Sequence, residues 1–182
     1  MNFDRVILGI DPGTNIMGYG VICIKDKKFA SADMGIVKLT KISDVYLKLK
    51  EIHKQTRNLL DKYTPDELAI EAPFYGKNVQ SMLKLGRAQG VAISAALQND
   101  IPIFEYAPRK IKQAITGQGS ASKEQVADML KSILKISIEA ESYDATDGLA
   151  VALCHYYQRN QVSSSSYNSW KDFMSKNPDK IK

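Results

Sequence analysis

The chain has 182 residues, 44% of them hydrophobic and 25% charged, with a formal net charge of +5. These values indicate one globular domain with a substantial core. They exclude a membrane protein, because no stretch approaches the roughly 20 apolar residues of a membrane span. The N-terminus also lacks the zones of a signal peptide, so we expect a cytoplasmic protein.

The positive charge is concentrated in two segments. Residues 77–123 hold seven basic and two acidic residues, and residues 159–182 hold five basic and two acidic residues. Concentrated basic charge suits an anionic partner, although a solvated surface is the commoner reason for such a run. Cys23 and Cys154 lie in apolar runs and are expected to be buried free thiols.

Periodicity predicts ten elements, beginning with three strands in an antiparallel meander. The strands are expected at Val6–Ile10, Gly20–Ile24, Phe29–Val37, Glu67–Glu71 and Ile101–Tyr106. The helices are expected at Ile42–Tyr63, Val79–Gln98, Pro108–Ile115, Lys123–Leu134 and Asp144–Gln158, with a capping box formed by Ser122 and Gln125.

This order of elements predicts an α/β fold with a five-stranded mixed sheet flanked by helices. We expect residues 1–158 to form the domain. Residues 159–182 contain four consecutive serines and little periodicity, so they are predicted to be a flexible basic tail.

Four acidic residues interrupt or end apolar elements. Asp11 ends the first predicted strand and Glu71 ends the fourth. Asp144 and Asp147 lie three residues apart at the start of the last predicted helix, so they share one face of it. If the first and fourth strands are neighbours, all four carboxylates can converge at one edge of the sheet.

Each carboxylate also has a simpler interpretation. Asp11 precedes Pro-Gly and is a common type of turn residue, Asp144 can cap a helix, and Glu71 can reach solvent. Together, four carboxylates at one place would repel each other without a cation. Oxygen ligands without Cys or His favour Mg²⁺ or Mn²⁺, and two such ions can support hydrolysis of a phosphodiester.

Five stretches resemble a known family at its order and spacing. They are ILGIDPGTNIMGYGVI (7–22), LAIEAPFYGKN (68–78), LKLGRAQGVAI (83–93), IFEYAPRKIKQAITGQGSASK (103–123) and YDATDGLAVAL (143–153). This combination is similar to the RuvC family of bacterial Holliday-junction resolvases, which have an RNase H-like fold.

The resemblance implies that Asp11, Glu71, Asp144 and Asp147 are the catalytic, metal-binding tetrad. It also implies a homodimer that nicks two strands of four-way junction DNA symmetrically and leaves 5′-phosphate and 3′-hydroxyl ends. Magnesium is the implied cofactor, with Mn²⁺ able to substitute and two ions per site. A RuvA–RuvB complex is the implied branch-migration partner.

The same resemblance indicates residues that contact DNA. Phe74 matches an aromatic side chain that stacks on bases at the junction centre, and Tyr75, Lys77 and Asn78 flank it. A Phe packed into the core below the loop is the alternative. An aromatic pair beside a lysine suits base stacking combined with phosphate contact.

Three further basic residues are expected to bind DNA. Lys112 and Lys123 match family lysines close to the active site, and Arg109 and Lys110 are near enough to act in place of Lys112. Lys123 lies near the start of a helix, where its charge opposes the helix dipole, which favours a phosphate partner. Gly148 departs from the family pattern, where alanine is common, and is expected to weaken its helix.

Other functions remain open at this point. The Asp11-Pro12-Gly13-Thr14 turn resembles the phosphate-binding turn of actin-like ATPases and sugar kinases, but those need two lobes and this chain has one. A YqgF-type RNA-processing nuclease shares the hairpin aspartate. A DNA-binding protein without catalytic activity does not need four carboxylates beside a basic surface. The Val79–Gln98 helix is a candidate dimer interface, or it packs on the sheet.

Overall fold

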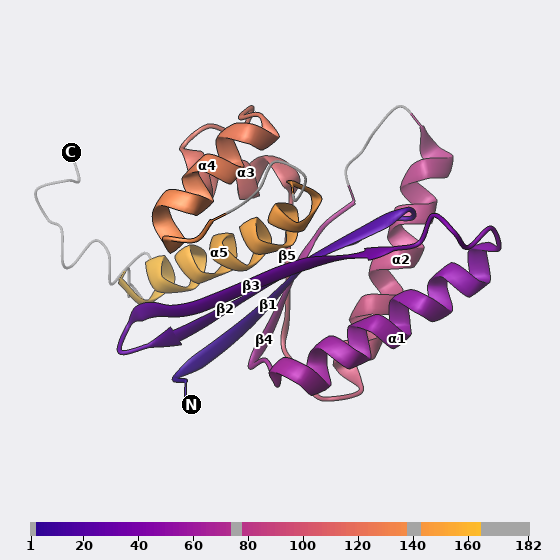
Figure 1. Ribbon diagram of the computed structural model, residues 1–182, viewed down its shortest axis with the longest axis horizontal. Coiled ribbons are helices and arrows are strands. Elements are labelled where there is room, and N and C mark those ends of the chain that lie inside the picture. Colours follow the sequence, from indigo (N-terminus) through magenta and orange to yellow (C-terminus); the bar gives the residue numbers. More distant parts are fainter. Residues whose placement is uncertain (1–2, 74–77, 138–142, 165–182) are drawn as a thin grey trace, which may run out of the picture.

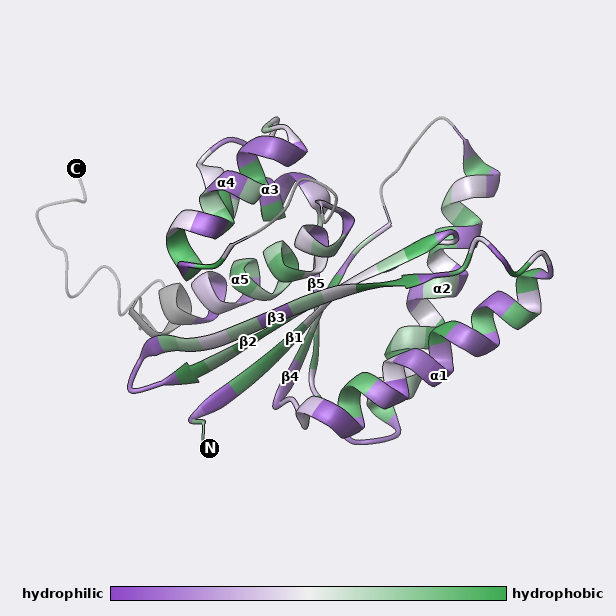
Figure 2. Cartoon of the chain, viewed as in Figure 1, coloured by the Kyte–Doolittle hydropathy of each residue, from purple (hydrophilic) through white to green (hydrophobic). Residues whose placement is uncertain are grey.

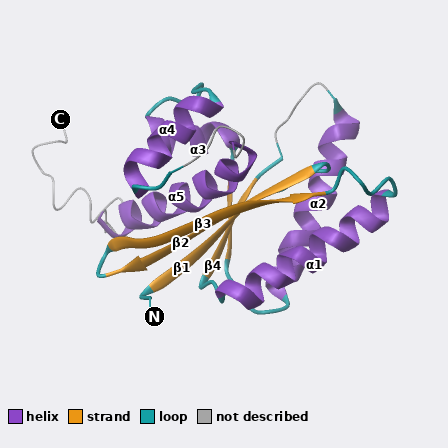
Figure 3. Cartoon of the chain, viewed as in Figure 1, coloured by secondary structure: helices purple, strands orange, loops and turns teal. Residues whose placement is uncertain are grey.

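The computed structural model describes residues 3–73, 78–137 and 143–164. The elements follow the order expected from the sequence, and Figure 3 distinguishes the helices from the strands by colour. They are β1 (Arg5–Asp11), β2 (Ile16–Lys25), β3 (Lys28–Lys38), α1 (Val45–Tyr63), β4 (Glu67–Glu71), α2 (Val79–Leu97), β5 (Ile103–Tyr106), α3 (Pro108–Thr116), α4 (Lys123–Leu134) and α5 (Tyr143–Ser164).

The five strands form one mixed sheet in the order β3-β2-β1-β4-β5. β1, β2 and β3 are antiparallel neighbours, whereas β1, β4 and β5 run parallel. The predicted meander is therefore confirmed, and the first and fourth strands are neighbours, which is the condition for the carboxylates to converge. Parallel pairing brings the carboxyl ends of β1, β4 and β5 to one edge of the sheet.

Helices cover both faces of the sheet (Figure 1). α3, α4 and α5 lie on one face, and α1 and α2 lie on the other. Successive residues of a strand point to opposite faces, so Ile7 packs in the core beneath α5, and its neighbour Leu8 packs in the core beneath α1 and α2. β1, β2 and β4 are accordingly buried and apolar along most of their length, whereas the edge strand β3 has no buried residue (Figure 2).

Capping residues account for most of the helix boundaries. The Asp44 side chain accepts a hydrogen bond from the Leu47 backbone nitrogen, so α1 begins at Val45 rather than at the predicted Ile42. The predicted capping box of α4 is confirmed, because both the Ser122 and the Gln125 side chains make their bonds. Gly117 ends α3 in the left-handed conformation, with φ of 77°.

The last helix is longer than expected. α5 continues beyond residue 158 to Ser164, so the first six residues of the predicted tail are helical, and the rest of that tail lies outside the described residues. Cys23 and Cys154 are buried free thiols, as predicted. Across the described ranges, no helix combines the length and the hydrophobicity that crossing a membrane requires.

Candidate active site

Asp11 and Glu71 lie side by side because of the strand register. Ile10 of β1 pairs with Ile70 of β4, and each strand ends one residue later with its carboxylate. Alternation along β4 places Glu71 on the same face as Ala69, which packs in the core beneath α5. Both carboxylates therefore point toward the first turns of α5, where Asp144 and Asp147 lie.

Glycine residues allow α5 to approach the sheet closely. Gly18 pairs with Asp11, and a Cβ atom on Gly18 would collide with the Asp144 carbonyl oxygen. A Cβ atom on Gly148 would lie 2.7 Å from the Gly20 backbone nitrogen. Gly148 was predicted only to weaken its helix, but its position shows that it gives α5 backbone contact with β2. That contact sets the depth of Asp147 in the site.

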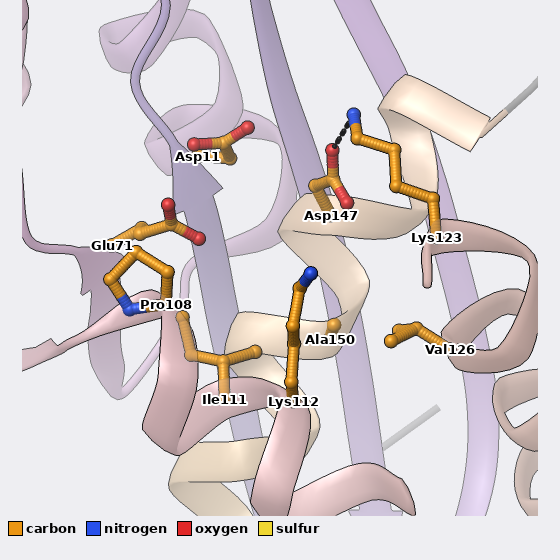
Figure 4. A pocket seen from close by; sticks show the side chains of 9 residues that line it. All are labelled: Asp11, Glu71, Pro108, Ile111, Lys112, Lys123, Val126, Asp147 and Ala150. Carbon is orange, nitrogen blue, oxygen red and sulfur yellow. Dashed lines mark hydrogen bonds and ion pairs between the residues drawn. The ribbon is translucent and has the colours of Figure 1, made fainter. Parts of the chain in front are cut away.

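Three of the four predicted carboxylates line one hollow of about 230 Å³. Asp11, Glu71 and Asp147 contribute from β1, β4 and α5, and Lys112 and Lys123 contribute from α3 and α4 (Figure 4). The remaining lining residues are Pro108, Ile111, Val126 and Ala150.

Asp144 lies beside this hollow and is not among its lining residues. Its side chain is 49% exposed, compared with 20% for Asp147. The structure therefore brings three predicted carboxylates together and places the fourth one helical turn away, where it contacts Lys123.

Lys123 links both aspartates of α5. Its Nζ donates to Asp147 Oδ2 at 2.7 Å and to Asp144 Oδ1 at 3.2 Å. Burial acts to lower the pKa of Lys123, but the hydrogen bonds and charges of the two aspartates outweigh it and raise the pKa overall. The ammonium is therefore charged and partly neutralises the site.

Lys112 supports the same region from α3. Its Nζ donates to the backbone oxygen of Ala121 at 2.8 Å, and its side chain lines the hollow. This bond ties α3 to the loop that leads into α4. The bond fixes the start of α4 and thereby the position of Lys123.

The two strand-end carboxyls hold protons more strongly than usual. Burial raises the pKa of Asp11 to about 7, and the negative charge of Asp147 adds to this effect. Burial raises the pKa of Glu71 to about 8, with further contributions from Asp11 and Asp147. Burial also raises the pKa of Asp147, although Lys123 opposes the change. Buried carboxyls that raise each other's pKa are typical of a site for a cation.

The donor set fits Mg²⁺ or Mn²⁺ in its chemistry. All the donors are carboxylate oxygens, and the Lys123 ammonium already lies where a positive charge is favourable. As the side chains lie, no three His, Cys, Asp or Glu residues in the described parts of the chain are close enough to hold an ion. The four-carboxylate metal site therefore stays a prediction.

The other predicted DNA contacts are distributed differently. Phe74, Tyr75 and Lys77 lie outside the described residues. Asn78 caps α2, because its side chain accepts a hydrogen bond from the Ser81 backbone nitrogen at 3.1 Å. Arg109 is exposed at the start of α3 and is not among the residues that line the hollow.

Gln89 of α2 supports the site and is not apparent from the sequence alone. This buried side chain donates to the Glu71 backbone oxygen at 3.3 Å and to Glu105 Oε2 at 2.8 Å. It fixes the end of β4, and the Ala72 nitrogen adds a 2.9 Å bond to the Tyr106 oxygen. An amide within an alanine-rich helical face was the only signal in the sequence.

A buried polar network holds the later turns of α5 against the sheet. His155 of α5 is fully buried and lies 2.7 Å from the Tyr106 hydroxyl and 3.0 Å from Glu67 Oε2. Arg5 Nε also donates to Glu67 at 2.6 Å. Burial lowers the pKa of His155, so its neutral form is favoured and the network joins β4, β5 and α5.

Solved structures share this architecture. Thermus thermophilus RuvC in complex with Holliday junction substrate matches with a TM-score of 0.75 and 30% identity, covering 86% of this chain and 96% of that one. The yeast mitochondrial Holliday junction resolvase Ydc2 shares the fold, with a TM-score of 0.65 and 16% identity over 87% of this chain and 80% of its own. The fold and the carboxylate-lined hollow define an endonuclease with an RNase H-like fold.

Sequence comparison identifies the family within that class. The family model for crossover junction endodeoxyribonuclease RuvC matches residues 7–155. The protein of that name from Bacteroides fragilis is 58% identical over 182 residues, which are 98% of this chain and 97% of the relative. The chain therefore belongs to the RuvC family of crossover junction endodeoxyribonucleases, and the ATPase, YqgF-type and non-catalytic alternatives are excluded.

Proposed function

We propose that this endonuclease binds four-way junction DNA and uses Asp11, Glu71, Asp144 and Asp147 to hold two Mg²⁺ or Mn²⁺ ions. Hydrolysis leaves 5′-phosphate and 3′-hydroxyl ends on two symmetrically nicked strands. The main support is the convergence of three of these carboxylates and two lysines on one hollow, in a chain of this family.

The bound ions supply Lewis-acid activation of water and stabilisation of the leaving oxygen. The chain itself orients the substrate. Lys112 and Lys123 place positive charge on the wall of the hollow that faces Asp11 and Glu71 (Figure 4), so they suit the oxygens of a phosphate held between them.

Release of Lys123 from the aspartates is part of this proposal. Its ammonium pairs with Asp144 and Asp147 in the protein alone, and the side chain is 51% exposed. When cations take over the two carboxylates, the same ammonium becomes available to a DNA phosphate nearby. The proposal also retains Phe74, Tyr75, Lys77, Asn78 and Arg109 as DNA contacts outside the hollow.

The homodimer is proposed to form through α2. One face of this helix packs inward through alanines, and the opposite face exposes large apolar side chains. Val79, Leu83 and Leu97 are 58%, 50% and 59% exposed. Gly86 and Gly90 have open space around them, so a second helix can approach closely there. Burial of this apolar face against a second copy would favour association.

Two further parts of the proposal follow from the family. The Thermus thermophilus relative is solved with a Holliday junction substrate, which supports the same DNA partner for this chain. A RuvA–RuvB branch-migration complex is the proposed protein partner, and the cytoplasm is the proposed compartment, because both are implied by the resemblance.

A cleavage assay on a synthetic four-way junction tests the function. Purified protein should nick two opposing strands in Mg²⁺ or Mn²⁺, and a chelator should stop the reaction. Asp11→Asn should abolish cleavage and retain junction binding, because it removes a predicted metal ligand. Asp128→Asn is the matched control, since Asp128 is an exposed residue of α4 that pairs with Lys131.

Two outcomes would contradict the proposal. Tight binding of the junction without any nicking in either metal would remove the catalytic role. Cleavage by Asp11→Asn at a near-normal rate would remove Asp11 from the metal site. Mapping the product ends with a phosphatase and a kinase checks the proposed 5′-phosphate.

A further inference from the structure

A basic hollow of about 290 Å³ lies beside the turn that follows Asp11, on the side of α1 and α2. Its lining combines apolar side chains with polar and positively charged ones. The lining residues are Thr14, Asn15, Ser43, Val45, Lys48, Leu49, Ile52, Lys84, Arg87 and Ala88.

The three cations of the basic hollow differ in how they are held. Lys48 Nζ donates to the Thr14 oxygen at 2.9 Å and to Asn15 Oδ1 at 3.0 Å, so it fixes the turn after β1. Lys84 and Arg87 are exposed and lie three residues apart on α2. Neither takes part in an ion pair with another described residue.

Among the described residues, no carboxylate lines the basic hollow. Two acids adjoin lining residues in the sequence: the Asp44 side chain is engaged as the cap of α1, and Glu51 accepts a hydrogen bond from Gln55 at 2.7 Å. Two unpaired cations beside hydroxyl and amide groups are the donor set that proteins use to hold phosphate oxygens.

The basic hollow lies near the catalytic hollow, which is the one lined by Asp11, Glu71 and Asp147. A third hollow between them is lined by Asp11 and Glu71, which also line the catalytic one. Gly13 and Leu85 also line this third hollow, and their chain neighbours Thr14 and Lys84 line the basic one. Shared and chain-neighbouring residues thus outline a candidate path from Lys123, past Asp11 and Glu71, to Lys84 and Arg87.

We propose that Lys84 and Arg87 bind the phosphate groups of the nucleic-acid strand that passes through the active site. A strand whose scissile phosphate lies at Asp11 and Glu71 continues along the path into the basic hollow, where the two cations neutralise its next phosphates. Lys48 acts as a positioning residue, because it holds the turn that forms one wall. This inference rests on the proposed function and adds a second anchoring point to it.

The salt dependence of junction binding tests the proposal. Lys84→Gln and Arg87→Gln, combined in one variant, remove two charges and keep most of the side-chain length. Loss of two phosphate contacts per copy, four in the proposed homodimer, should reduce the magnitude of the slope of log K against log salt by about 3.6. Between 50 and 200 mM salt, the variant should therefore lose roughly 150-fold less affinity than the unaltered protein.

Lys50→Gln combined with Lys54→Gln is the matched control. Both lysines are exposed on α1 and lie outside the three hollows, and the change in net charge is the same. The control should keep the original salt slope. Equal slopes for the two double variants would overturn the proposal, because net charge alone would then explain the effect.

Neutral phosphate replacements test whether the contact is made by the cleaved strand. Methylphosphonates are placed one at a time along that strand on either side of the cleaved bond, and binding is measured in a chelator. At least one replacement should weaken binding by the unaltered protein and have no effect on the Lys84→Gln, Arg87→Gln variant. If every replacement affects both proteins equally, the proposal is overturned.

A free anion is the other ligand that could supply phosphate oxygens to Lys84 and Arg87. Inorganic phosphate and dAMP are titrated into the protein, with amide chemical shifts of Lys84 and Arg87 as the readout. Weak, non-saturating shifts support a site for a nucleic-acid strand, and saturation at low concentration would assign the hollow to a free nucleotide instead. If the unaltered protein cuts junctions but its double variant keeps the original salt slope, only this inference is lost. Absence of cleavage by the unaltered protein contradicts the proposed function itself.

Discussion

Lys123 and Asp147 form the shortest bond across the active-site hollow, with 2.7 Å between Nζ and Oδ2. The same ammonium lies 3.2 Å from Asp144 Oδ1. A single lysine therefore supplies part of the positive charge that the α5 aspartates need. Any cation that binds these two carboxylates competes with it.

Lys123→Met should consequently tighten metal binding by the DNA-free protein. Removing the ammonium eliminates both the competition and the repulsion of an incoming cation, and we expect about a tenfold lower Kd for Mn²⁺. The same variant should cleave junctions more slowly, because a phosphate contact is lost. Titration calorimetry or Mn²⁺ electron paramagnetic resonance measures the affinity without DNA.

Lys131→Met is the control for this prediction. Lys131 lies on the same helix and pairs with Asp128 away from the hollow. Its substitution should leave Mn²⁺ affinity unchanged. Weaker Mn²⁺ binding by Lys123→Met would contradict the competition and would indicate that Lys123 organises the carboxylates for the metal.

The raised pKa values of Asp11 and Glu71 predict how stability depends on pH without metal. Their folded-state values of about 7 and about 8 exceed the ordinary values of 3.8 and 4.5. The folded protein therefore binds more protons than the unfolded chain between about pH 4 and pH 8. Under this linkage the free energy of unfolding falls as the pH rises through that window. Mg²⁺ should reverse the fall by binding the ionised carboxylates.

Asp11→Asn isolates the contribution of Asp11 to this dependence of stability on pH. The amide cannot ionise, and it removes a charge that raises the pKa of Glu71. In EDTA, the Tm of this variant should fall less steeply with pH than that of the unaltered protein and should exceed it at pH 8. Asp128→Asn, an exposed site, should keep the original profile. Parallel profiles for Asp11→Asn and the unaltered protein would show that Asp11 ionises normally.

Backbone contact between α5 and β2 predicts a strong effect of a small substitution. In Gly148→Ala the added Cβ would meet the Gly20 nitrogen at 2.7 Å, and backbone atoms cannot rotate away. We expect a loss of about 2 kcal/mol in the free energy of unfolding, in spite of the higher helix propensity of alanine. Cleavage should also fall, because α5 carries Asp147. Chemical denaturation and the junction assay measure the two effects.

Ser132→Ala tests how much helix propensity alone contributes to the free energy of unfolding. Ser132 is an exposed position of α4, where alanine should raise stability by a few tenths of a kcal/mol. A Gly148→Ala protein as stable as the unaltered one would mean that α5 moves away from the sheet at little cost. Its cleavage rate would then report whether that movement displaces Asp147.

The nearness of Asp11 and Glu71 could be expected from the sequence on the single condition that the first and fourth strands are neighbours. Both residues end apolar strands, and parallel neighbours bring such ends together. The contact of Lys123 with Asp147 could not be predicted in this way. It depends on how α4 packs against α5, which is a tertiary relationship between side chains of two helices.

Gln89 and Gly148 show the same limit. The sequence places each residue in a helix, but only the packed structure shows what the residue contacts. The Gln89 side chain donates to the Glu71 carbonyl oxygen, and Gly148 lets α5 contact the β2 backbone. The end of α5 was misplaced for a related reason, because polar residues 159–164 have no apolar period to signal a helix.

The exposed apolar face of α2 gives the prediction for the homodimer. Leu83→Glu would place a charge within the proposed interface, where its burial against a second copy is unfavourable. The unaltered protein should sediment at twice the chain mass of 20.3 kDa, and this variant should sediment at the mass of one chain. Analytical ultracentrifugation at micromolar concentration distinguishes the two states.

Leu47→Glu is the matched control, because Leu47 lies on α1 and is 55% exposed, compared with 50% for Leu83. The same change at similar exposure should leave the dimer intact. A Leu83→Glu monomer that still folds should bind a junction more weakly and nick one strand without the symmetric partner cut, since each copy contributes one active site. A dimeric Leu83→Glu protein, or a monomeric Leu47→Glu protein, would place the interface elsewhere than on α2.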